Sequence, residues 1–108
     1  MHAFEISYLI KTCTQSGSPY LEFMRVPTLS TGVYLLSAGA SDEQEPHTED
    51  EVYYVIQGRG TIRVGNEDRP VEAGSVIFVA AKVEHRFHSI NEDMVILVFF
   101  APAEYSNA

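Results

Sequence analysis

A histidine flanked by carboxylates, between residues 39 and 58, is the part of the sequence whose residue types could do chemistry. Within GASDEQEPHTEDEVYYVIQG, Glu45, His47 and Glu51 are separated by even numbers of residues. Because successive side chains of an extended strand point to opposite faces, an extended chain would place these three on one face. Imidazole and carboxylate groups bind divalent transition metals such as Fe, Mn, Ni, Co or Zn. The segment therefore predicts part of a metal site.

A further ligand must come from a distant part of the chain, because one strand does not surround an ion. His85, in the segment VEHRFHS, lies in a second passage from turn to strand and is the candidate. In an extended HRFHSI segment His88 would point away from the face of His85, so His88, like His2, is interpreted as structural. Two histidines and one carboxylate leave coordination positions open for a substrate or dioxygen.

Other side chains of the same segment have alternative interpretations. Glu45 could supply a fourth ligand, and Glu49 has the same parity, whereas Asp50 has the opposite parity and is the weaker candidate. Tyr53 shares the parity of Glu51 and could donate a proton or a hydrogen bond in catalysis. It could equally be an aromatic residue that fills the interior.

Composition limits the class of protein. The 108 residues are expected to form one domain, 1–108, and 45% of them are hydrophobic, which suffices for a core. A net charge of −8, with seven Lys and Arg, argues against nucleic acid as a partner. No run of about eighteen apolar residues and no secretion leader is visible, so we expect a cytoplasmic protein without a membrane span. The single Cys13 has no partner for a disulfide and is interpreted as an incidental thiol.

Short apolar stretches that could position these groups recur from Tyr20 onward. They are rich in Val, Ile, Tyr and Phe and bounded by turn residues, which predicts an all-β barrel or sandwich. The stretches are YLEFMRV, TGVYLLSA, EVYYVIQ, TIRVG, SVIFVA, HRFHSI and MVILVFF. Turns are expected at Gly65 and Asn66, at Gly74, and at the INED segment before MVILVFF.

Residues 1–18 are predicted to form a strand over Phe4–Ile10 and a polar lead-in, and no helix is expected. The stretches MVILVFF and SVIFVA are apolar on both alternating faces. Both faces of each should therefore be covered, one of them by a neighbouring element or a second subunit, which favours a homodimer.

The two histidine segments together resemble the paired motifs of the cupin superfamily. The first family motif is glycine, five residues, histidine, one residue, histidine, three or four residues, glutamate, six residues and glycine. It is matched here at Gly39, His47, Glu51 and Gly58, with Glu45 in place of the first histidine. In the second motif Gly74 and His85 match, while the usual Pro, Gly and Asn are replaced by Ala80, Lys82 and Ser89.

The resemblance covers about residues 20–102 and implies a double-stranded β-helix, or jelly-roll, barrel. It implies that His47, Glu51 and His85 point into the barrel mouth as ligands of one divalent metal. The replacement at Glu45 leaves its role open between metal ligand, substrate contact and solvent-facing side chain. The replacements of Pro and Gly in the second motif should change loop geometry more than chemistry.

Three functional classes fit these features, in the following order. The first is a metal-dependent enzyme, such as an oxygenase or isomerase, that acts on a small organic acid, a sugar or a similar metabolite. The second is a binding module or sensor that captures a small ligand without turnover. The third is a structural barrel, in which the metal ligands would have no purpose. A barrel of this size encloses at most one small ligand.

Overall fold

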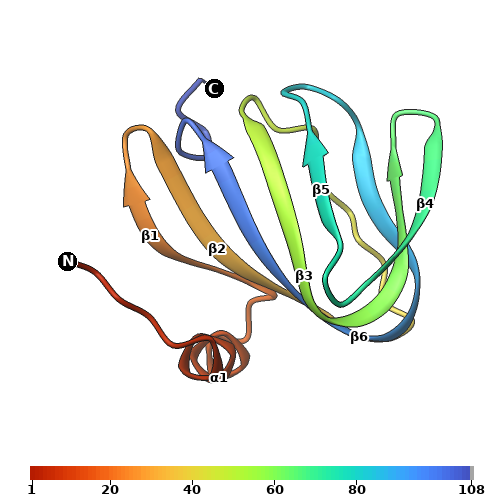
Figure 1. Cartoon of the computed structure of the whole chain (residues 1–108), viewed down its shortest axis with the longest axis horizontal. Coiled ribbons are helices and arrows are strands. Elements are labelled where there is room, and N and C mark those ends of the chain that lie inside the picture. The colour runs from red at the N-terminus through yellow and green to blue at the C-terminus, as the bar shows by residue number, and fades with distance from the viewer. Residues whose placement is uncertain (108) are drawn as a thin grey trace.

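The computed structural model describes residues 1–107, and the chain forms one helix followed by six strands (Figure 1). Strands hold 53% of the residues and helix 10%, which confirms the predicted all-β class. No helix within the described residues is long and apolar enough to cross a bilayer. The elements are α1 (Ile6–Ser16), β1 (Tyr20–Val26), β2 (Leu29–Leu36), β3 (Asp50–Val64), β4 (Glu67–Glu72), β5 (Val76–Val79) and β6 (His85–Ala101).

The strands form one antiparallel sheet that folds over on itself. The order is β1-β2-β6-β3-β4, and β5 pairs with the first part of β3. Figure 1 shows β3 and β6 curving together at the bottom of the view, so that β4 and β5 rise opposite β1 and β2. The pairing of β3 with β6 shifts register three times between Val55 and Thr61, which is where the two strands bend. Such irregularities increase local bending and twist, and they let a sheet close around a core.

The central strands are longer than the sequence predicted. EVYYVIQ and TIRVG form one strand, because Gly58 adopts a positive φ of 95° within β3 and bends it without ending it. The turn predicted at INED is wrong, since β6 runs through it without reversing. One residue of β3, Gly60, lies opposite the segment 89–91 of β6, so the extra residues are absorbed as a bulge. The turns at Gly65 and Gly74 are confirmed, each with a positive φ.

The strand predicted over Phe4–Ile10 is also wrong, because the segment lies largely in helix α1. The apolar residues recur at the three- and four-residue spacing of a helix face. Leu9 and Cys13 are buried on that face, and Gly17, with φ 77°, ends the helix in the left-handed conformation. The apolar residues of FEISYLI fit both the two-residue spacing of a strand and the spacing of a helix. Packing against the sheet stabilises the helix. The helix face consists of Ile6, Leu9, Ile10 and Cys13.

Two apolar clusters lie on opposite faces of β6. The interior cluster includes Tyr53, Phe87, Ile96 and Phe100, and the outer cluster packs α1 against Val33 of β2 and Val95 of β6. The two-faced apolar pattern of MVILVFF is therefore satisfied within one chain. One apolar face of SVIFVA stays uncovered, because Val76 and Phe78 of β5 are 67% and 61% exposed.

Candidate metal centre

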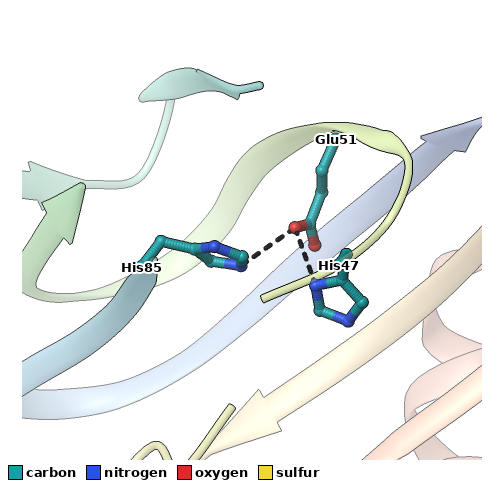
Figure 2. A group of neighbouring side chains, drawn as sticks. All are labelled: His47, Glu51 and His85. Atoms are coloured by element: carbon teal, nitrogen blue, oxygen red, sulfur yellow. Dashed lines mark ion pairs between the residues drawn. The ribbon is translucent and has the colours of Figure 1, made fainter. Parts of the chain in front are cut away.

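His47, Glu51 and His85 converge inside the folded sheet (Figure 2). Glu51 lies near the start of β3 and His85 is the first residue of β6. In the antiparallel ladder these positions are at opposite ends, since Glu51 pairs with Phe100 and Val64 pairs with His85. The bend of the two strands brings the ends together. His47 comes from the irregular segment that precedes β3.

The three side chains offer one ligand atom each, and these atoms all lie within 4.8 Å of one another. Glu51 Oε1 is 3.0 Å from His85 Nε2 and 3.4 Å from His47 Nδ1. The three residues are only 1% (Glu51), 6% (His85) and 9% (His47) exposed. Donor atoms held about 2.1 Å from one ion are about 3.0–3.4 Å apart for right-angled to tetrahedral arrangements. The separations of Glu51 Oε1 from the two nitrogens fall in that range.

These same three atoms lack hydrogen-bond partners. His47 Nδ1, Glu51 Oε1 and His85 Nε2 are buried, and although they approach one another closely, none is in hydrogen-bonding geometry. Buried polar atoms are rarely left unsatisfied, because desolvation without a partner is costly. A divalent cation would satisfy all three at once, so the group fits a metal ion.

The outer nitrogen of each imidazole has its own partner. His85 Nδ1 lies 2.9 Å from the carbonyl oxygen of Val83, which can only accept, so Nδ1 donates and Nε2 is the nitrogen left to bind a metal. His47 Nε2 lies 3.1 Å from Glu104 Oε2. Partners of this kind orient metal-binding histidines and increase their basicity.

Electrostatics within the group favour charged forms when no metal is bound. Burial is the largest influence on His47 and lowers its pKa, but the carboxylates of Glu104 and Glu51 outweigh it and raise the pKa to about 9. For His85 burial is again opposed, chiefly by Glu51, and its pKa is raised. Burial would raise the pKa of Glu51, yet the two neighbouring histidines outweigh it and lower the pKa. The metal-free group therefore holds a proton that a metal would displace.

The other acidic candidates are placed elsewhere. Residues 40–49 are not in a strand, so the even spacing of Glu45 does not bring it to the face of Glu51, and Glu45 is exposed. Glu49 is buried and accepts hydrogen bonds from the backbone N–H groups of Tyr105 and Asn107. Asp50 accepts one from the N–H of Ala81. Glu49 and Asp50 thus hold loops in place beside the triad, and a ligand role for Glu45 stays a prediction.

Tyr53 faces the interior as its parity predicted, and it is 1% exposed. Its hydroxyl donates to Gln44 Oε1 at 3.2 Å, and its ring centroid lies 5.9 Å from that of His85. A catalytic role for Tyr53 stays a prediction.

A cavity of about 350 Å³ opens beside His47 and Glu51. Four tyrosines line it, together with apolar residues of β6 and carboxylates of the 43–45 loop. Its volume is that of a small-molecule site. The tyrosines are Tyr20, Tyr34, Tyr53 and Tyr105.

Glu104 is a site residue that the sequence analysis missed. It lines the cavity and contacts His47, and it lies in the turn that follows β6. Its N–H donates to Ser30 Oγ at 2.9 Å, and its carbonyl oxygen accepts from Arg25 Nη2 at 2.7 Å. Nothing in the motif spacing marks this position, because the turn is positioned by β1 and β2, far away in sequence.

Comparisons with known proteins agree with this architecture. An RmlC-like cupin of Methanocaldococcus jannaschii with a double-stranded β-helix fold matches with a TM-score of 0.70 and 16% identity, over 77% of this chain and 78% of that one. Salicylate 1,2-dioxygenase of Pseudoaminobacter salicylatoxidans (A85H mutant) matches with a TM-score of 0.80 and 17% identity, over 91% of this chain and 34% of that enzyme. These matches confirm the predicted jelly-roll fold.

The sequence itself matches at higher identity. The uncharacterized protein SCO3923 of Streptomyces coelicolor is 45% identical over 104 residues, which are 96% of this chain and 99% of that protein. The family profile described as Cupin domain matches residues 32–100, a range that includes His47, Glu51 and His85. The chain therefore belongs to the cupin family.

Proposed function

We propose that the chain binds one divalent transition metal through His47, Glu51 and His85 and acts as a metal-dependent enzyme on a small organic molecule in the adjacent cavity. The observation that carries the metal site is the meeting of three buried ligand atoms that have no hydrogen-bond partners. The cavity beside them gives a small substrate access to the same point.

The chemistry would be that of an oxygenase or an isomerase. A metal bound there would supply a Lewis acid for a carbonyl or enolate oxygen, or a position for dioxygen beside a chelating substrate. Glu104 would hold the His47 ring through Nε2, and burial of the three ligand residues would keep bulk water from their ligand atoms. An enzyme is favoured over a binding module because Glu104 places a carboxylate in the cavity beside the triad, where it contacts His47.

Metal analysis of protein purified without chelator tests the metal site. We expect close to one transition metal ion per chain, and loss of most of it in His47→Ala and His85→Ala. His88→Ala is the matched control, because His88 also lies in β6 but pairs with Asp68 at 2.8 Å, away from the triad. Full metal content in both ligand variants would reject the site.

The fourth ligand position is tested in the same way. Glu45 lines the cavity from an irregular loop and is not among the three residues whose ligand atoms converge. Weaker metal binding by Glu45→Gln would assign Glu45 as a ligand. Unchanged binding would leave it at the cavity mouth.

A homodimer is part of the proposal. Val76 and Phe78 of β5 are exposed, and they pair in register with Tyr54 and Val52 of β3, so an apolar strip runs over the outer face of these strands. A second copy of the chain would cover this strip.

A further inference from the structure

Apart from His47, which would be a ligand of the metal, the ionisable groups at the cavity beside the triad are carboxylates and tyrosine phenols. Carboxylates of Glu43, Glu45, Glu51 and Glu104 border it, and no Lys or Arg is among its described lining residues. A divalent ion at the triad would offset two of these four charges, and two would remain. The electrostatic potential of the cavity would therefore repel an anionic ligand and attract a cationic one.

The hydrogen-bonding groups of the cavity are mainly acceptors. The hydroxyl of Tyr34 donates to Asp42 Oδ1 at 2.5 Å and that of Tyr53 donates to Gln44 Oε1, so both protons are already used within the protein. Burial is the main cause that raises the pKa of Tyr20 and of Tyr34, and nearby carboxylates add to it, so both phenols stay uncharged. Donor groups on a ligand would match these acceptors.

The aromatic walls add a second attraction for positive charge. The rings of Tyr20 and Tyr34 meet nearly at right angles, with 6.1 Å between centroids and 76° between planes. Gly32 makes room for this corner, because a Cβ there would lie 2.1 Å from the Tyr20 ring. The Tyr20 hydroxyl is buried without a partner. Tyrosine faces attract ammonium groups, and the effect grows when the site is desolvated.

The absence of Lys and Arg among the described lining residues distinguishes this cavity from a second one. A neighbouring cavity of about 460 Å³, across the 42–46 loop, is lined by Arg63 and Arg86 as well as by carboxylates. Basic side chains are therefore available close by in the fold, but they do not border the cavity of the tyrosines.

We propose that the substrate or ligand of this cavity is a small molecule that carries an ammonium group, and that the cavity discriminates against anions. The proposal rests on the proposed function in so far as the same cavity is the substrate site. It narrows the substrate class from organic acids, sugars and similar metabolites to amines and amino-group-bearing metabolites.

Three aromatic compounds of similar size and different charge test the proposal: benzylammonium, benzyl alcohol and benzoate. Calorimetric titration into the metal-loaded chain should show that benzylammonium binds about tenfold more tightly than benzoate, with benzyl alcohol between them. Benzoate is a stringent competitor, because its carboxylate can bind a metal. Benzoate binding as tightly as benzylammonium, or no benzylammonium binding at millimolar concentration, would overturn the proposal.

Two variants locate the binding and a third controls for charge. Glu104→Gln and Glu43→Gln should each weaken benzylammonium binding several-fold while narrowing the gap to benzoate. Glu67→Gln removes an exposed carboxylate of β4 outside the cavity and should leave the ranking unchanged. Equal effects of all three would refute binding in this cavity. Metal analysis of the same samples reports separately on the proposed function, so the two proposals can fail independently.

Discussion

His47 joins the metal group to the cavity, because its two ring nitrogens have different partners. Nδ1 faces Glu51 at 3.4 Å and Nε2 faces Glu104 at 3.1 Å. A carboxylate on the outer nitrogen fixes the ring and makes the inner nitrogen a better donor to a metal. The same two carboxylates stabilise a protonated ring when no metal is present, so metal and proton compete for this residue.

The free energy of unfolding of the metal-free protein should therefore depend on pH through His47. Its pKa is about 9 in the folded chain, above the ordinary value of 6.5. A raised pKa stabilises the folded state fully below the unfolded value, and this contribution is lost as pH rises through the folded value. We expect metal-free protein to lose on the order of 1–3 kcal/mol from this residue between pH 6.5 and about 9 in urea denaturation.

Two variants serve as controls for this pH dependence. His47→Gln should lack most of the loss, and Glu104→Gln should show a smaller loss than the wild type, because it removes one of the two carboxylates. An identical pH dependence in His47→Gln would contradict the prediction. Metal binding should strengthen over the same pH range, since deprotonation frees the ring.

At the scale of elements, the curvature of β3 and β6 makes the site. Glu51 and His85 meet only because the two strands bend together near Gly58, where β3 passes close to β6. The sequence predicted the strands and the residue types of the triad. It did not predict the bend. Residues such as Gly, Asn and Asp occur both at β-bulges and at turns, so Gly58 and the INED segment were interpreted as chain reversals.

The remaining errors have similar physical causes. Helix α1 was missed because a short apolar segment fits both periodicities, and its burial against β2 and β6 is a tertiary effect. His47 was predicted from strand parity, but it reaches Glu51 and His85 from an irregular loop, so the spacing argument assumed the wrong local structure. Glu104 was invisible because only the closed fold brings it to His47.

Gly58→Ala should test the bend. The residue has φ 95°, and a Cβ there would lie 2.2 Å from the carbonyl oxygen of Asp93. Gly74 is the matched control, because it has the same φ of 95° with nothing within 4 Å of the added Cβ. Backbone strain should cost each variant about 1–3 kcal/mol, and the clash should add to the loss for Gly58→Ala only. Equal losses of stability in urea denaturation would show that the close approach is unimportant.

At the scale of the whole molecule, the outer face of the sheet is covered unevenly. Helix α1 packs over β2 and β6, and it buries Val33 and Val95. Over β3 and β5 nothing within the described chain covers Tyr54, Val76 and Phe78, which are 41%, 67% and 61% exposed. The three candidate metal ligands thus come from one chain, while part of the outer face over β3 and β5 stays exposed.

The homodimer prediction belongs to this uncovered face. A second copy seated on the strip would remove Phe78 and Val76 from water, which contributes roughly 25 cal/mol for each Å² of apolar area buried. We expect the wild-type chain to sediment as a dimer, and Phe78→Ser to shift it toward monomer. Tyr8→Ser is the matched control, because Tyr8 is an equally exposed aromatic residue, 69%, on α1. A monomeric wild-type chain would refute the dimer. Since the triad and cavity residues come from one chain, Phe78→Ser should keep its metal content.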